Sequence, residues 1–431
     1  MRRQVLWVGA LGVALLAAGC GGADEASSGG GWLGEEPAFG AGGGGAGPLT
    51  EAEAAAPGTV ADSSSGTDAL APRAEGLRAG SVDDNADYAG FLEYLDRIGG
   101  AGVTTRDFDA TGRVLVRLVG SDGLPLPGEV VEVSVGNDVV ASLRTTADGT
   151  ARFWPGLYGQ PGASAFELSA AGETASAAAG DEVTMTADRA GGRQGPMAVD
   201  IMFLLDATGS MGDEIDRLKS TIDSVAGRVA ELEGSPDARF GMTLYRDEED
   251  QFLTSTYDLT DDLDAFRSAL DDVRADGGGD YPEALDEGLA DALGEPSWRD
   301  PATTVQLVFL VADAPPQVGR QVEQAYPASV VEAVGRGAKV FPIASSESDD
   351  QAEAVFRQVA AGTGSRFVFL SYGAGGAATG DSSDITATDY EEMSLDDLVV
   401  RLVAEELAAL NGEVPTAPTT PTTSPSTPPD Q

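Results

Sequence analysis

The chain of 431 residues carries 71 acidic and 26 basic side chains, a formal net charge of -45 at pH 7. This charge disfavours binding to nucleic acid and to anionic lipid surfaces. The sequence has no histidine and one cysteine, which excludes Ser-His-Asp and Cys-His catalysis, histidine or thiolate zinc sites and internal disulfides. A metal site would therefore use oxygen ligands, which suit Mg2+, Mn2+ or Ca2+.

Residues 1–20 have the pattern of a bacterial secretion signal. Two arginines precede an apolar run over residues 5–18, which is too short for an ordinary membrane-spanning helix. The run ends in Leu-Ala-Ala-Gly-Cys, which resembles the lipobox of bacterial lipoproteins, with Ala17 where that family most often has leucine. The resemblance implies that Cys20 is lipidated; the alternative is an ordinary signal peptide with an incidental cysteine.

A lipidated Cys20 would tether the protein to a membrane through its acyl chains only. Gly21 follows the cysteine in place of the aspartate that retains many lipoproteins at the inner membrane. We therefore expect an anchor in the cell envelope, at the outer membrane or the cell surface.

Residues 21–110 are rich in glycine, alanine, serine and acidic residues, so we expect a disordered tether. The spacing of its apolar residues predicts one short helix over 88–98. Residues 111–190 change to short strand patterns with turn clusters between them. Asp148 and Gly149 predict a hairpin turn, and the whole segment resembles an Ig-like β-sandwich of the carboxypeptidase-regulatory type. We interpret this sandwich as a spacer, with a binding module as the alternative.

Strand and helix patterns alternate over residues 196–412. We expect strands over 199–205, 239–245, 252–257, 305–311, 339–343 and 366–370, and helices over 215–229, 263–273, 283–293, 327–334, 352–361 and 395–410. The fold class is thus α/β, a doubly wound and mainly parallel sheet preceded by a small all-β sandwich. Ligands in such sheets bind at the carboxyl ends of the strands. The Thr/Pro-rich residues 413–431 predict a disordered tail.

Oxygen-bearing side chains follow the first buried strand of this region. Asp206, Thr208 and Ser210 alternate in the segment DATGSM, and Gly209 permits a tight turn, so the three side chains can converge on one small cation. The pattern matches D-x-[S/T]-x-S, the motif that opens the metal-ion-dependent adhesion site of von Willebrand factor A domains. This resemblance to the family implies that the three residues are metal ligands, some of them acting through water.

Two further segments extend the resemblance. GGGDYPEAL, residues 277–285, occupies the place of the second ligand loop, where many family members supply a threonine and this chain offers Asp280. FLVADAPP, residues 309–316, ends a buried strand, and the resemblance implies Asp313 as the ligand of the third loop. Taken singly, Ser210 and Asp280 could instead be helix N-caps and Asp313 a strand terminator.

Three aspartates around one Mg2+ would leave the site with a formal charge of -1, from 2 positive and 3 negative charges. Such a site is a poor acceptor for an acidic side chain of a partner. We therefore expect a structural metal, or a metal that takes a neutral or weakly charged oxygen. The acidic residues 247–250 follow the second strand, and we interpret them as a solvated turn rather than a second cation site.

The resemblance favours a non-enzymatic binding protein that attaches to an unidentified protein or surface polymer through the metal. One alternative is an envelope scaffold with a structural metal. Another is a metal-dependent phosphohydrolase, which would need an aspartate two residues after Asp206, where the chain has Thr208.

Overall fold

The computed structural model describes residues 77–412, apart from residues 193–196, 346–347 and 372–392 and the single positions Glu249 and Asp280. The predicted signal sequence with Cys20 and the predicted tail over 413–431 lie outside these residues. Within the described part of the chain, no helix is both long and apolar enough to cross a membrane.

The largest element of the fold is an eight-stranded sheet in the order β11-β10-β9-β12-β13-β14-β1-β15. The five neighbouring strands β10, β9, β12, β13 and β14 run parallel to one another. The strands β11, β1 and β15 are joined to the sheet by antiparallel pairing. The strand bounds are β9 Ala198–Asp206, β10 Asp237–Tyr245, β11 Thr254–Thr260, β12 Thr304–Ala312, β13 Lys339–Ala344, β14 Phe367–Ser371, β1 Arg78–Val82 and β15 Met393–Ser394.

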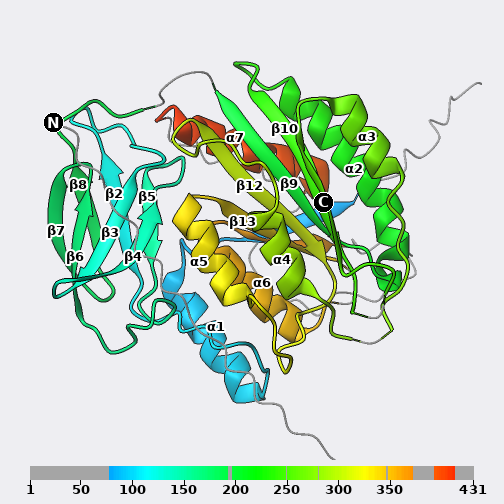
Figure 1. Ribbon diagram of the computed structural model, residues 1–431, viewed down its shortest axis with the longest axis horizontal. Coiled ribbons are helices and arrows are strands. Elements are labelled where there is room, and N and C mark those ends of the chain that lie inside the picture. The colour runs from blue at the N-terminus through cyan, green and yellow to red at the C-terminus, as the bar shows by residue number, and fades with distance from the viewer. Residues whose placement is uncertain are drawn as a thin grey trace, which may run out of the picture. The chain divides into compact units, whose positions relative to one another are not determined.

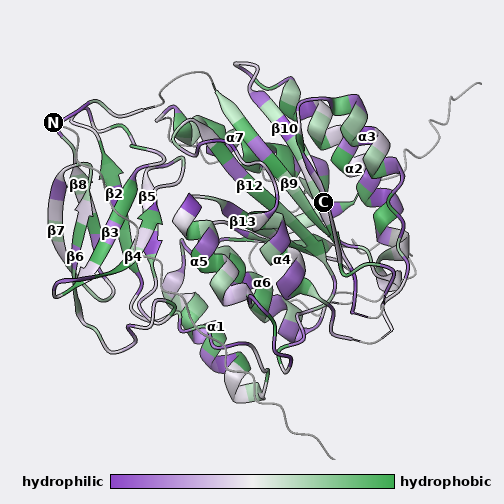
Figure 2. Ribbon diagram, in the orientation of Figure 1, coloured by the Kyte–Doolittle hydropathy of each residue, from purple (hydrophilic) through white to green (hydrophobic). Residues whose placement is uncertain are grey.

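Helices cover both faces of this sheet (Figure 1). Alternate residues of β9 enter two separate cores, Phe203 on one face and Leu204 on the other, because successive side chains of a strand point to opposite sides. In Figure 2 the central strands are largely in hydrophobic colours, while the helices show both polar and apolar surfaces. The first core holds α2 Gly212–Ala230, α3 Leu263–Asp271 and α7 Leu395–Leu410; the second holds α1 Tyr88–Ala101, α4 Leu285–Gly294, α5 Tyr326–Arg336 and α6 Asp350–Thr363.

The prediction of a mainly parallel α/β sheet is confirmed, but the tether was predicted to extend too far. Residues 78–82 form β1, which pairs with β14 from Arg78↔Ser371 to Val82↔Phe367. The predicted short helix is present as α1, and its Phe91 and Tyr94 are buried. A strand as short as β1, with few large apolar residues, gives little signal in the sequence, and its place is set by the sheet that it joins.

The segment before the large sheet forms two smaller sheets, β5-β2-β8 and β4-β3-β6-β7, around a shared core. The predicted hairpin at Asp148-Gly149 is wrong, because the strands on its two sides lie in different sheets. Gly149 has the positive φ, 72°, that the turn was expected to need. The bounds are β2 Val114–Val119, β3 Val130–Val135, β4 Asp138–Arg144, β5 Thr150–Phe153, β6 Ala165–Ala170, β7 Glu173–Ala178 and β8 Glu182–Thr186.

The β-sandwich is packed directly against the α/β sheet region. Trp154 is fully buried in the core that contains α4, α5 and α6, and its indole N–H donates to the Gly362 carbonyl at 3.1 Å. Gly128, at φ 70°, brings the sandwich so close to the loop before β12 that a Cβ there would lie 2.3 Å from the Ala302 Cα. Close packing of this kind differs from the loose attachment that a spacer needs.

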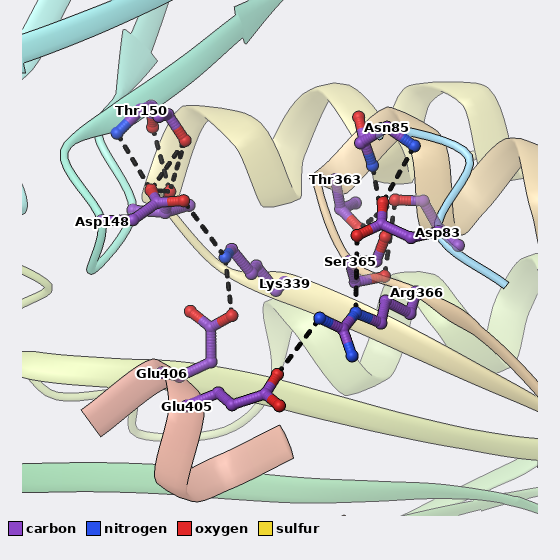
Figure 3. Close-up of polar contacts among 12 residues, drawn as sticks. Asp83, Asn85, Asp148, Thr150, Lys339, Thr363, Ser365, Arg366, Glu405 and Glu406 are labelled. Atoms are coloured by element: carbon purple, nitrogen blue, oxygen red, sulfur yellow. Dashed lines mark hydrogen bonds and ion pairs between the residues drawn. The ribbon is translucent and has the colours of Figure 1, made fainter. Parts of the chain in front are cut away.

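A charged cluster lies in the same interface (Figure 3). The Lys339 ammonium donates to Glu406 of α7 at 2.7 Å and lies 3.7 Å from Asp148 of the sandwich. Lys339 and Glu406 are 6% and 13% exposed. Burial would lower the pKa of Lys339, but the two carboxylates raise it, so the lysine stays charged. The cluster therefore joins the half-buried Asp148 of the sandwich to the last helix through the buried Lys339.

Candidate metal centre at the carboxyl edge of the sheet

Three of the predicted ligands lie at the last residue of β9 and in the turn that follows it. The Thr208 hydroxyl and amide donate to Asp206 Oδ1 at 2.6 and 3.0 Å, and the Thr208 and Ser210 hydroxyl oxygens lie 3.1 Å apart. Asp206 and Thr208 are fully buried, whereas Ser210 is exposed. The loop therefore gathers one carboxylate and two hydroxyls, with the outermost oxygen reachable from solvent.

Backbone hydrogen bonds hold this loop against its neighbours. The Ala207 amide donates to the Tyr245 carbonyl at the end of β10, and the Ala207 carbonyl accepts from the Asp276 amide. The Gly209 amide donates to the Gly277 carbonyl at 2.9 Å. The first and second predicted ligand loops are therefore adjacent, although about 70 residues separate them in the sequence.

Asp313 follows β12, the strand that pairs in parallel with β9. The register places Val311 beside Leu205, so the loops that carry Asp206 and Asp313 leave the same edge of the sheet. Burial and the charge of Asp313 raise the pKa of Asp206 to about 7, against the hydrogen bonds from Thr208. Two buried carboxylates that repel each other are stabilised by a cation between them.

Asp280 is one of the positions that the structure does not describe, so its predicted role as a ligand has no structural account. The loop around it is described. The Gly278 amide donates to Asp250 Oδ2 at 2.9 Å, and the Tyr281-Pro282 peptide bond is cis. Gly278 has φ 69° and no room for a side chain, because a Cβ would lie 2.9 Å from both Thr208 Cβ and Glu283 Oε1.

Glu283 is a residue of this edge that the sequence interpretation missed. It was expected to begin a helix, but α4 begins at Leu285, and Glu283 forms a parallel bridge with Pro316. Its side chain is 4% exposed and lies beside Gly278, which Thr208 also approaches. The negative charges of Asp206, Asp313 and Glu283 all act on the buried Tyr245 hydroxyl, whose pKa is raised well above its usual value, first by burial.

The acidic run over 247–250 has defined partners at its described positions. Asp250 accepts from the amides of Asp247 and Gly278, and Glu248 pairs with Arg320 at 2.9 Å. Asp247 accepts from the Gln317 amide at 2.9 Å. These contacts fit a turn, but the prediction of a solvated turn is only partly right, because Asp247 is buried.

The ligand atoms that this edge offers are carboxylate and hydroxyl oxygens, which suit a hard divalent cation. Among the described residues, no donor reaches Oδ2 of Asp206 with normal hydrogen-bond geometry, and that oxygen is buried. No three His, Cys, Asp or Glu side chains within the described ranges are close enough to hold a metal by themselves. Hydroxyls would therefore have to complete the ligand set, and hydroxyl, carboxylate and water oxygens are the ligands that Mg2+ prefers.

The family model of the von Willebrand factor A domain matches residues 200–372. The chain contains a von Willebrand factor A domain. Domains of this family are general modules of protein interaction and adhesion that can bind a metal ion at this edge of the sheet. The match includes all three predicted ligand loops and leaves out β1, α1 and the β-sandwich.

A curated relative, "Alpha-protein kinase vwkA" from Dictyostelium discoideum, is 32% identical over 118 residues, which are 27% of this chain and 18% of the relative. The chain thus spans about a fifth of that relative's length. One similar solved structure is the pilus adhesin SpaC from Lactobacillus rhamnosus GG, which is 12% identical over 57% of this chain and 32% of that chain, at a TM-score of 0.34. Another is BatB from Bacteroides thetaiotaomicron, which is 13% identical over 48% of this chain and 98% of that chain, at a TM-score of 0.33. Proximal thread matrix protein 1 from the mussel byssus, with a zinc-occupied metal site, is 17% identical over 38% of this chain and 40% of that chain, at a TM-score of 0.31.

Proposed function

We propose that the von Willebrand factor A domain binds one divalent cation, Mg2+ in the first instance, and holds an oxygen of a protein or surface ligand through it. The observation that carries the proposal is the buried pair of carboxylates, Asp206 and Asp313, with the hydroxyls of Thr208 and Ser210 beside it. A buried carboxylate with a raised pKa lacks a compensating charge, and a cation supplies it. Asp280 completes the set on the evidence of the sequence motif.

Each residue has a separate task in this proposal. Asp206 and Asp313 supply the negative charge, and Thr208 and Ser210 supply neutral oxygens from the first loop. Glu283 is buried beside Gly278 at the same edge, where its negative charge acts on the site without making it one of the ligands. Asp206 and Asp313 alone balance the charge of a divalent cation, and the predicted ligand Asp280 would exceed it. The bound metal would therefore favour a neutral ligand oxygen, such as a hydroxyl or a carbonyl, over another carboxylate.

The protein would act by binding rather than by catalysis, tethered to the cell envelope through Cys20. Support for the tether comes only from the lipobox-like sequence and the apolar run before it. The scaffold alternative predicts that attachment to a partner survives a chelator, whereas the metal-dependent module predicts that attachment is lost and returns with Mg2+.

The test is calorimetric titration of Mg2+, Mn2+ and Ca2+ into the chelator-treated full chain. We expect saturable binding at one site that Asp206→Ala abolishes, because the substitution removes a buried ligand carboxylate. Asp216→Ala, which removes a carboxylate that is 84% exposed on α2, serves as the control for general attraction of cations to an acidic surface. Identical titrations of all three proteins would overturn the metal site and leave the fold standing.

A further inference from the structure

We propose that Arg106 is a positioning residue for the metal edge, the carboxyl edge of the sheet where Asp206 and Asp313 lie. It fixes the loop after Asp313 to the start of α4. The inference rests on the proposed metal binding. Arg106 lies in the connection between α1 and β2, about 100 residues before the first ligand loop and outside the residues that match the family. The segment before the sandwich would then contribute to the binding site.

The Arg106 guanidinium joins two parts of the metal edge. Its Nε donates to Asp286 Oδ2 at 2.9 Å, and Nη2 donates to the same oxygen. Its other hydrogens reach three backbone carbonyls, those of Arg320 at 3.1 Å, Gln317 at 3.3 Å and Val318 at 3.5 Å. One side chain thus binds the first turn of α4 and the segment 317–320 at once, which the planar fork of an arginine permits.

Both of the segments that Arg106 joins carry residues of the candidate site. Residues 317–320 continue the loop that begins at Asp313, and Asp286 lies three positions after Glu283. The Glu283 amide donates to the Pro315 carbonyl at 3.1 Å, and the Gln317 side chain donates to the Pro282 carbonyl at 3.0 Å. The position of the Asp313 loop relative to Glu283 therefore depends on contacts that Arg106 reinforces.

The burial of the pair makes it a firm anchor. Arg106 is 14% and Asp286 1% exposed, and the second oxygen of Asp286 accepts from the Tyr326 amide at 2.7 Å. Without the guanidinium, Asp286 would be a buried carboxylate without its cation, and three loop carbonyls would lose a donor. Relaxation of the loop is the expected response, because water must then reach these groups.

The charge of Arg106 and its role in holding the loop predict opposite effects of its removal on metal affinity. A positive charge near a cation site opposes metal binding, so its removal would tighten binding if the field alone mattered. If Arg106 positions the loop, its removal weakens binding. Arg106→Lys separates the two further, since lysine keeps the charge but cannot span a carboxylate and three carbonyls.

The experiment is Mg2+ and Mn2+ titration of the full chain carrying Arg106→Lys or Arg106→Ala, with hydrogen exchange of the amides at 317–320 measured on the same samples. We expect the dissociation constant to rise about tenfold or more, as for removal of other residues that support metal ligands. Exchange at 317–320 should rise as well. The matched control is Arg239→Ala. Arg239 is 18% exposed and pairs with the fully buried Asp200 near the amino end of β9, at the opposite edge of the sheet.

Each outcome decides a separate point. Weaker binding in both Arg106 variants, with unchanged binding in Arg239→Ala, supports the positioning role. Unchanged or tighter binding in the Arg106 variants overturns it while metal binding itself stands. Absence of saturable binding in the unmodified chain overturns the proposed function and this inference with it. If Arg106→Ala does not fold, the lysine variant still decides: unchanged metal binding in it, with unchanged exchange of the Arg320 amide that donates to the Gln317 carbonyl, overturns the positioning role.

Discussion

Asp206 combines full burial with a neighbouring negative charge, and these two features make the metal-free domain sensitive to pH. Burial and Asp313 raise its pKa to about 7 from an ordinary value of 3.8. Between these two values the unfolded chain has released the proton while the folded domain still holds it. The contribution of Asp206 to stability is therefore fully present below the lower value and is lost as the pH rises through the upper one.

We expect Mg2+ to raise the unfolding temperature of the full chain more at about pH 8 than at about pH 5, because the cation replaces the proton that stabilises Asp206. Thermal unfolding with and without Mg2+ measures this. Asp206→Asn is the control, since the amide is similar in size but has no charge to titrate. Equal pH dependence in the metal-free wild-type and variant proteins would contradict the assignment.

The residues of the site differ in how well their roles can be predicted from the sequence. Asp206, Thr208, Ser210 and Asp313 follow buried strands in a recognisable order, and the structure brings their loops to one edge of the sheet. Glu283 and Arg106 could not be found in this way. Their roles depend on close contacts between segments far apart in the chain, and a glutamate before a helix or an arginine in a loop has an ordinary explanation by itself.

At the scale of elements, periodicity predicted the helices and strands of the α/β region well because each buries a continuous apolar face. The expected helix over 395–410 coincides with α7, and the expected strand over 199–205 lies within β9. β1 was missed, since Arg78–Val82 has only alanine and valine to bury and a glycine at its centre. Its pairing with β14 and β15 is long-range information that a local pattern lacks.

The insertion of β1 into the sheet predicts that the segment is needed for folding. Ala79 is fully buried in the core with α2 and α7, so Ala79→Asp would bury a charge without a partner. We expect a loss of several kcal/mol in the free energy of unfolding, measured by urea denaturation of the full chain. Ala89→Asp places the same charge on an exposed position of α1 and should change stability little. Equal stability of the two variants would show that β1 contributes little to the sheet.

At the scale of the whole described chain, the sandwich and the von Willebrand factor A domain share more than a linker. Trp154 of the sandwich belongs to a core of the domain, and Lys339 joins Asp148 of the sandwich to Glu406 of the last helix. The sequence indicated a sandwich but gave no sign of this interface, because its charged residues are unremarkable until folding brings them together. We therefore expect the two parts to unfold together.

Lys339→Met tests this coupling. The substitution keeps most of the side-chain volume but removes the cation that pairs with the buried Glu406, and breaking a buried ion pair typically costs about 3–5 kcal/mol. We expect differential scanning calorimetry of the full chain to show one transition for the wild-type protein and a lower, broadened or divided transition for the variant, because the sandwich and α7 are then less firmly joined. Lys219→Met, which removes a lysine whose partner Asp216 is exposed on α2, should leave the transition almost unchanged. Two separate transitions in the wild-type protein would instead mean that the sandwich folds independently, and the sandwich would again be best interpreted as a spacer.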